Sequence, residues 1–183
     1  MAKLPLFKFK AFTTESFQTT SVAWTAEALA GKAFPSDVEQ LISWSADHLQ
    51  PIVGKSVVYG IFPDNNNSKV ADAICVLVIT RHSPRSKWVK MLKVNLRPKI
   101  DEALNSVDDS SNFAMREALA IFMNATIGVL QFGESENAST IKVYGRTRQQ
   151  LDFLRFLGIE LEKVKTNPMR STMEGRFLVV KSI

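Results

Sequence analysis

Three stretches in the middle of the chain are rich in β-branched and aromatic residues. They span residues 55–63, 71–81 and 87–98, and turn-forming segments separate them, so we predict three consecutive antiparallel strands. The middle stretch contains AICVLVI, which is apolar at nearly every position, as expected for a central strand covered on both faces. Alternating residues at 3–12 predict an edge strand.

Two helices are predicted between the edge strand and the middle strands. Thr19 or Thr20 can cap the first helix, and Gly31 should end it. The segment SDVE at 36–39 has the side chains of a capping box and marks the start of the second helix. That helix should stop before Pro51.

The C-terminal half predicts two more helices. Residues 113–132 are apolar on almost every side and should form a deeply packed helix after a polar loop at 100–112. A strand at 140–145 precedes a helix whose start has a capping box between Thr147 and Gln150.

Gly158 should end this last helix. Segments 158–165 and 175–183 should then form a hairpin around the turn at Asn167 and Pro168. The whole order predicts a single domain of the α/β (α+β) class. Its central sheet should be mixed but mostly antiparallel, with about six or seven strands and flanking helices.

Composition is that of an ordinary globular protein. Apolar residues make up 45% and charged residues 22% of the 183 residues. No continuous apolar run approaches the roughly 20 residues that span a bilayer, and the N-terminus lacks the features of a secretory signal. We therefore expect a cytoplasmic protein with no membrane partner. Cys75 lies inside AICVLVI and is interpreted as a buried small hydrophobe.

The formal charge of +5 and the pI near 9.4 favour an acidic partner, which could be nucleic acid, a nucleotide cofactor or an acidic protein surface. Basic side chains concentrate at residues 81–99. A hairpin tip with Arg81, Arg85 and Lys87 beside Trp88 could contact phosphates. Solvated turn residues are the alternative interpretation.

Strict alternation along the strand WVKMLKVNL places Lys90 on the face of Trp88. Lys93 and Arg97 then fall on the opposite face, which splits the charge.

A second basic group, Arg146, Arg148 and Arg155, surrounds the last predicted helix. It could engage an anionic ligand at the helix start or remain as surface charge. An exposed Phe153 or Phe156 would indicate a partner surface.

Chemistry-bearing side chains are few. Glu39, Asp47 and His48 are predicted on the second helix, but the adjacent Asp47 and His48 face different directions there, which disfavours a proton relay. With two histidines, one cysteine and no ligand-like spacing, a metal site is not expected.

The order of elements, together with LKVNLRP before a buried helix and FLRFLGI in a capped one, resembles the GNAT superfamily of N-acetyltransferases. Phe153, Gly158 and Ile159 match the family's late helix. The resemblance implies that acetyl-CoA would lie between the splayed fourth and fifth strands. Its expected cradle is the backbone near Leu92, Val94 and Leu96, with Arg146 and Arg148 as phosphate contacts.

This sequence departs from the family at the cofactor loop and the catalytic tyrosine. No glycine occurs between Pro98 and Phe113, whereas the family's loop uses glycines to enclose a pyrophosphate. The loop instead carries four carboxylates, Asp101, Glu102, Asp108 and Asp109. Leu154 occupies the position of the family's tyrosine. We therefore favour a non-catalytic binding module, with an active N-acyltransferase as the alternative.

Overall fold

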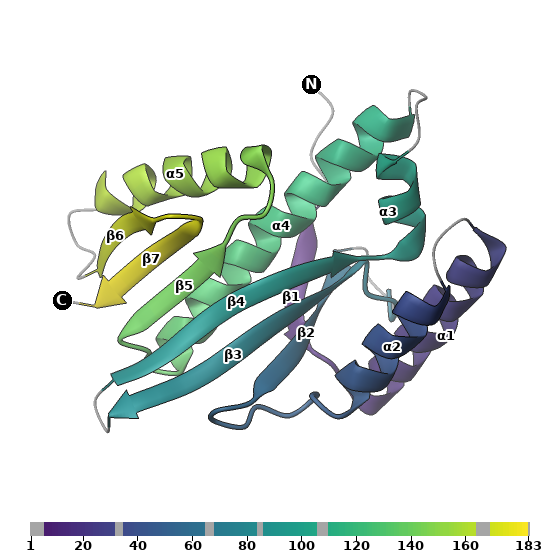
Figure 1. Cartoon of the computed structure of the whole chain (residues 1–183), viewed down its shortest axis with the longest axis horizontal. Helices are drawn as coiled ribbons and strands as arrows, with labels where there is room; N and C mark the ends of the chain where they lie inside the picture. The colour runs from purple at the N-terminus through teal and green to yellow at the C-terminus, as the bar shows by residue number, and fades with distance from the viewer. Residues whose placement is uncertain are drawn as a thin grey trace.

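The computed structural model describes residues 6–31, 35–64, 68–83, 86–105, 110–163 and 169–182. These form one seven-stranded sheet flanked by helices (Figure 1). The elements in chain order are β1 (Phe7–Ala11), α1 (Thr14–Ala30), α2 (Pro35–Ala46), β2 (Ser56–Pro63), β3 (Ala73–Ser83), β4 (Ser86–Leu96), α3 (Pro98–Leu104), α4 (Ser110–Ser135), β5 (Thr140–Tyr144), α5 (Arg148–Lys163), β6 (Met169–Glu174) and β7 (Phe177–Ser182).

The strand order is β1-β2-β3-β4-β5-β7-β6. All neighbours are antiparallel except β4 and β5, which run parallel. α3 and α4 form the crossover that a parallel pair requires. The predicted mixed, mostly antiparallel sheet is confirmed.

The helices pack on opposite faces of the sheet and at different places along it. α1 and α2 cover β2 and β3, where Trp24 packs with Val58 and Ile74, and we call this side the α1 face. α4 and α5 pack on the other side, around Ile121 and Leu154, which we call the α4 face. Figure 1 shows α1 and α2 together at the β2 end of the sheet, and α5 beside β6 and β7.

β3 is buried on both faces, as AICVLVI predicted. Ile74 contacts the cluster of the α1 face, and Cys75 contacts that of the α4 face. Burial raises the pKa of the Cys75 thiol far above its ordinary value. The interpretation of Cys75 as a buried small hydrophobe is confirmed.

α4 is the predicted packed helix. Ala125 and Val129 are fully buried against the sheet, whereas Phe113 and Ile127 are exposed. By length and composition alone, Asn112–Ser135 could cross a membrane. Its packing on the sheet is that of a core helix.

The starts of α1 and α2 differ from the prediction. α1 begins at Thr14 because Thr13 and Ser16 form a reciprocal capping box, so Thr19 and Thr20 lie inside the helix. α2 begins at Pro35 and ends at Ala46. Ser36 is therefore not the cap.

Gly158 does not end α5, which continues to Lys163. The prediction of a strand at 158–165 is therefore wrong, and β6 begins only at Met169. The glycine lets the helix approach the hairpin, because a Cβ there would lie 3.2 Å from Cδ1 of Leu178. The Ser171 hydroxyl donates to the Gly158 carbonyl at 2.7 Å.

The polar segment after β4 is not simply a loop. Pro98 opens the short helix α3, and Ile100 anchors it in the core. Asp101 is exposed, and a Cβ at Gly31 would collide with the Glu102 side chain, so Glu102 points toward the end of α1. Asp108 and Asp109 lie outside the described residues.

Candidate nucleic-acid interface

A β-bulge in β4 places Lys90 and Lys93 on the same face of the sheet. Lys90 pairs with Val78 of β3 and Lys93 pairs with Val76, so Leu92 is the extra residue between them. Val76 and Val78 are two residues apart and point to one face, and their partners do the same. The predicted split of the charge between two faces is wrong.

Lys90 and Lys93 project from the α1 face, because Val76 belongs to the cluster beneath α1 and α2. Those helices contact β2 and β3, while α4 and α5 join the cluster on the opposite side. Over β4, β5, β7 and β6, the described part of the chain places no helix on the α1 face. We call this four-stranded surface the open face.

The strand register identifies the side chains of the open face. Lys90 pairs with Lys142 of β5, Lys142 with Val179 of β7, and Val179 with Thr172 of β6. Ile141 alternates with them and is buried on the α4 face. The basic side chains that the four strands place on the open face are Lys90, Lys93, Lys142, Arg170 and Lys181.

Two pairs of like charges lie directly opposite each other. Lys90 and Lys142 are register partners across β4 and β5, and Arg170 and Lys181 are partners across β6 and β7. Like charges in such positions destabilise a sheet. An anionic ligand over the open face would neutralise both pairs.

Trp88 lies among these lysines. The Nζ atom of Lys90 is 5.3 Å from the ring centroid, and that of Lys142 is 4.9 Å from it, both within cation–π range. The indole N–H donates to the Ser86 hydroxyl at 3.0 Å. The ring is therefore held in one orientation with two ammonium groups beside it.

A second aromatic group lies at the far end of β5. Tyr144 and Phe177 are register partners whose ring centroids are 5.1 Å apart. The Arg176 guanidinium carbon is 5.8 Å from the centre of the Tyr144 ring. Its Nε donates to the Gly145 carbonyl at 3.0 Å, and its Nη2 donates to the carbonyl of Arg146.

Glu174 is the carboxylate that the described strand residues place on the open face. Its oxygens lie 3.1 Å from Nζ of Lys142 and 3.3 Å from Nζ of Lys181. Hydrogen bonds from Lys142, and then from Lys181, lower the pKa of Glu174. The carboxylate therefore stays charged at neutral pH and competes with an external anion for two lysines.

The predicted hairpin residues do not all join this surface. Arg81 and Lys87 are register partners, and Lys87 directly precedes Trp88 in β4. Successive side chains of a strand point to opposite faces, so Arg81 and Lys87 point to the α4 face. Lys87 forms an ion pair with Glu136. Among the residues of the predicted hairpin group that the structure describes, Trp88 alone lies on the open face. Arg85 lies outside the described residues.

The arginines near α5 also lie away from Trp88. Arg155 donates to Asp152 at 2.8 Å, and Arg148 lies 4.0 Å from the same carboxyl group. α5 packs on the α4 face, so these guanidinium groups project from the other side of the sheet. Phe153 packs against Phe122.

The start of α5 has the predicted capping box. Gln150 N–H donates to the Thr147 hydroxyl at 3.2 Å, and the Gln150 side chain accepts from the N–H groups of Thr147 at 3.2 Å and Arg146 at 2.7 Å. The Arg146 and Thr147 N–H groups are thus already engaged by protein. Phe156, further along α5, is 60% exposed.

β4 and β5 separate toward the end of β4. They pair only from Trp88 to Met91 on β4, although β4 continues to Leu96 along β3. Leu92 is exposed, while Val94 and Leu96 are partly buried against the core of the α4 face. This splay is the place where the resemblance puts acetyl-CoA.

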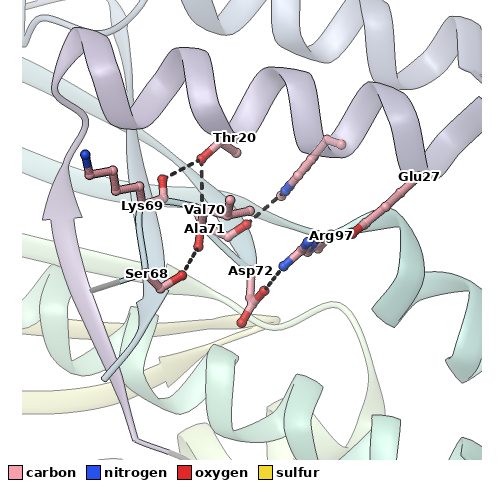
Figure 2. A network of polar contacts seen from close by, with 9 residues as sticks. Thr20, Glu27, Ser68, Lys69, Val70, Ala71, Asp72 and Arg97 are labelled. Carbon is pink, nitrogen blue, oxygen red and sulfur yellow. Dashed lines mark hydrogen bonds and ion pairs between the residues drawn. The ribbon is translucent and has the colours of Figure 1, made fainter. Parts of the chain in front are cut away.

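An ion-pair network joins the end of β4 to α1 (Figure 2). Arg97 donates to Asp72 at 3.0 Å and to Glu27 of α1 at 2.5 Å. Burial disfavours the Arg97 charge, but hydrogen bonds to Glu27 and Asp72 outweigh this effect and raise its pKa. Trp24 Nε1 donates to the Ala71 carbonyl at 2.9 Å. Arg97 therefore ties α1 to the sheet and is not available for a ligand.

Glu117 of α4 lies near the same network. Desolvation, and then the negative charge of Asp72, raise its pKa, while Lys99 and Arg97 oppose the shift. The carboxyl group is half-buried.

The candidate proton-relay residues are not arranged on one helix. Glu39 lies in α2, whereas Asp47 and His48 follow its end at Ala46. His48 stacks on Trp44 with centroids 4.0 Å apart. Within the described ranges, no group of three or more His, Cys, Asp or Glu side chains could hold a metal ion.

Comparison with known proteins finds no matching family model and no matching curated protein. Among solved structures, an acetyltransferase of Trypanosoma brucei is similar, with 9% identity, TM-score 0.42, and coverage of 83% of this chain and 91% of that one. The NatC complex bound to Gag peptide and CoA matches with 7% identity and TM-score 0.44 over 97% and 99% of the two chains. Arabidopsis thaliana Naa50 with a bisubstrate analogue matches with 11% identity and TM-score 0.39 over 97% and 99%.

The strand order and the parallel, splayed β4–β5 pair agree with the fold that the resemblance to the GNAT superfamily implies. Similarity at these low identities concerns the fold alone.

Sequence reasoning missed most of the open face. The alternation in TIKVY could have predicted that Lys142 points away from the face that carries Ile141 and Val143. Its place opposite Lys90 depends on the pairing of β5 with β4, which no local pattern specifies. Arg170, Glu174 and Lys181 were likewise not singled out.

Proposed function

We propose that this chain is a non-catalytic nucleic-acid-binding module on a GNAT-like scaffold, with the open face as its contact surface. The observation that carries the proposal is the pairing of like charges, Lys90 with Lys142 and Arg170 with Lys181. Phosphates along a nucleic-acid strand would neutralise these pairs and release counterions. Glu174 already forms ion pairs with one member of each pair, Lys142 and Lys181, so phosphates would offset the part of the repulsion that this single carboxylate leaves.

An aromatic ring among the lysines favours nucleic acid over an acidic protein. Trp88 is an aromatic side chain with two ammonium groups beside its ring, and surfaces that bind single-stranded nucleic acid combine aromatic with basic side chains. An acidic peptide would use the charges but would gain less from the ring.

The position that the resemblance assigns to a proton donor supports a non-catalytic role. Leu154 occupies it and is fully buried, and a leucine cannot protonate a leaving thiolate. α3 follows β4 directly, where the family's resemblance implies a glycine-rich loop. Both features disfavour chemistry in the family manner.

The splay of β4 from β5 favours one alternative, an active N-acyltransferase that uses acetyl-CoA. Leu92, Val94 and Leu96 lie along the unpaired part of β4. Calorimetric titration with acetyl-CoA and coenzyme A tests this alternative. Micromolar binding that survives moderate salt would support it, and no binding at millimolar ligand would exclude it.

The direct test of the proposed function is fluorescence anisotropy of a labelled 20-nucleotide single strand titrated with the protein at several salt concentrations. We expect binding that weakens steadily as salt rises, because each phosphate contact displaces counterions. Polyglutamate of similar charge is the matched probe for an acidic protein. Equal or tighter binding of polyglutamate, or no binding of the oligonucleotide at low salt, would contradict the proposal.

A further inference from the structure

We propose that β6 pairs with β6 of a second copy of this chain, so that two sheets join edge to edge in an antiparallel dimer. β6 is the last strand of the described sheet, and it pairs with β7 in continuous register along Met169–Glu174. A regular edge strand presents a row of backbone N–H and C=O groups to another strand. The inference goes beyond the proposed function and does not depend on nucleic-acid binding.

The backbone groups of two β6 residues face the free edge. A two-residue turn joins Glu174 to Phe177, and the residues that flank such a turn are hydrogen-bonded to each other. Bonded and non-bonded pairs alternate along an antiparallel ladder. Met173 and Ser171 therefore point their N–H and C=O groups away from β7.

Charge selects one register for the pair of β6 strands. A two-fold axis perpendicular to the sheet at Thr172 places Arg170 opposite the partner's Glu174, and Glu174 opposite the partner's Arg170. Ser171 then faces the partner's Met173, and both residues point to the free edge, as hydrogen bonding requires. Directly opposed charges of opposite sign stabilise a sheet. A shift by two residues in either direction would separate the charges, so this register alone forms both ion pairs.

The two charged side chains have the capacity for these ion pairs. The described carboxylates form no ion pair with Arg170, whose register partner on β7 is Lys181. The Glu174 oxygens accept from Lys142 and Lys181, and each oxygen of a carboxylate can accept a further hydrogen bond. The partner's Glu174 would therefore reduce the repulsion between Arg170 and Lys181.

The opposite edge of the sheet does not suit a second copy. β1 reads FKFKA and carries Lys8 and Lys10. Antiparallel pairing of two copies about Phe9 would place Lys8 opposite the partner's Lys10, and like charges in such positions destabilise a sheet. Lysines on an edge strand protect it from pairing in this way. β6 therefore differs from β1 in being complementary to itself.

α5 adds an exposed apolar side chain near the same axis. The Gly158 carbonyl accepts from the Ser171 hydroxyl at 2.7 Å, so this turn of α5 lies over the middle of β6. The next residue, Ile159, is 57% exposed. Phe153 packs against α4, and Ile159 lies about 120° from it around the helix. The two-fold axis would bring Ile159 and the partner's Ile159 toward each other and cover part of both side chains.

The dimer would be weak and would keep both open faces on one side of the joined sheet. One pair of strands and one helix contact make a small interface compared with those of permanent dimers. We expect a dissociation constant on the order of 10 µM. At lower concentrations the chain is a monomer, and Arg170 is then available to a phosphate.

The test is sedimentation velocity of the wild-type protein over roughly 1–200 µM, where a monomer should become a dimer. Arg170→Glu and Glu174→Arg each place like charges opposite each other across the axis, so each variant alone should dimerise at least about 10-fold more weakly. An equimolar mixture of the two variants should restore a dimer, because every opposed pair then has opposite charges. Lys55→Glu, which reverses an exposed charge before β2, is the control and should dimerise as the wild-type protein does.

A cysteine on the axis gives a second measurement. Thr172 and the partner's Thr172 form a non-hydrogen-bonded pair, whose Cα atoms lie about 4.5 Å apart, within the range of a disulfide. Thr172→Cys should therefore form a covalent dimer on oxidation, and Lys55→Cys should not. Cys75 is buried and does not compete.

Two results would overturn the inference. One is a wild-type protein that stays monomeric at every concentration. The other is a dimer that both charge variants keep unchanged, since such a dimer would use another surface. No nucleic acid is present in either measurement, so the outcome is independent of the proposed function.

Discussion

Lys90 lies directly opposite Lys142 across the parallel pair of β4 and β5, and both ammonium groups lie within 5.3 Å of the centre of the Trp88 ring. The ring's negative face attracts both cations, yet the cations repel each other. An anionic ligand beside both ammonium groups would reduce this repulsion. The same arrangement, without a ring, recurs between Arg170 and Lys181.

Replacing Arg170 should raise the stability of the protein and lower its affinity for nucleic acid. In Arg170→Gln, the repulsion with Lys181 is removed, so the free energy of unfolding should rise by about 0.2–1 kcal/mol. Affinity for single-stranded nucleic acid should fall, because one phosphate contact is lost. Urea denaturation and anisotropy titration measure the two effects, and a variant that loses stability without losing affinity would count against the open face.

Removing the carboxylate of the open face should strengthen binding. Glu174 holds Lys142 and Lys181 in ion pairs, so Glu174→Gln should free both lysines for phosphates. We expect an increase in affinity of about 1.5- to 5-fold at low salt. Glu160→Gln, which removes an exposed carboxylate on α5, is the control. Weaker binding by Glu174→Gln would contradict the assignment of the lysines.

The Arg97 network should matter for stability and not for binding. Arg97→Met leaves the Asp72 carboxylate, which is 8% exposed, without its guanidinium partner. We expect a loss of about 3 kcal/mol in the free energy of unfolding. Arg148→Met removes an exposed guanidinium that is 4.0 Å from Asp152 and should cost less than about 0.5 kcal/mol. Similar losses for the two variants would show that the network is not buried in solution.

Glu117 should make stability depend on pH. Its raised pKa means that the folded protein binds a proton more tightly than the unfolded chain does. Stability should therefore decrease as pH rises from the unfolded value near 4.5 through the folded value. Glu117→Gln should remove this decrease and stabilise the protein at neutral pH by about 1 kcal/mol or less, because the carboxyl keeps part of its hydration.

Thermal unfolding of both proteins between pH 4 and pH 7 measures this effect. The two curves should converge at the acid end, where the glutamate is protonated in both states. A wild-type protein more stable than Glu117→Gln at pH 7 would show that the carboxylate has a favourable partner.

Local signals predicted the parts of the fold that depend on local contacts. The capping box of Thr147 and Gln150 was correct because its hydrogen bonds join residues three positions apart. The prediction that Gly158 ends its helix was wrong because this glycine packs closely against Leu178, which is distant in sequence. A glycine-terminated helix and a glycine packed against a strand look alike in one sequence.

The bulge in β4 shows why the candidate site could be predicted only in part. WVKMLKVNL alternates well enough to suggest a regular strand, and no glycine marks Leu92 as an extra residue. The shift becomes visible only from the pairing of Lys90 and Lys93 with Val78 and Val76. One inserted residue therefore turned an apparent split of charge into a single basic surface.

The measurement that tests the central claim most directly is the salt dependence of single-strand binding for the wild-type protein and for Lys90→Gln/Lys93→Gln. The control, Arg116→Gln/Lys163→Gln, removes the same charge from α4 and α5 on the opposite side of the sheet. We predict that the slope of log K against log salt becomes shallower by about 1.4 for the Lys90/Lys93 variant, or about 0.7 for each lost phosphate contact, and stays unchanged for the control. Equal slopes for the wild-type protein and the Lys90/Lys93 variant would contradict the assignment of the open face.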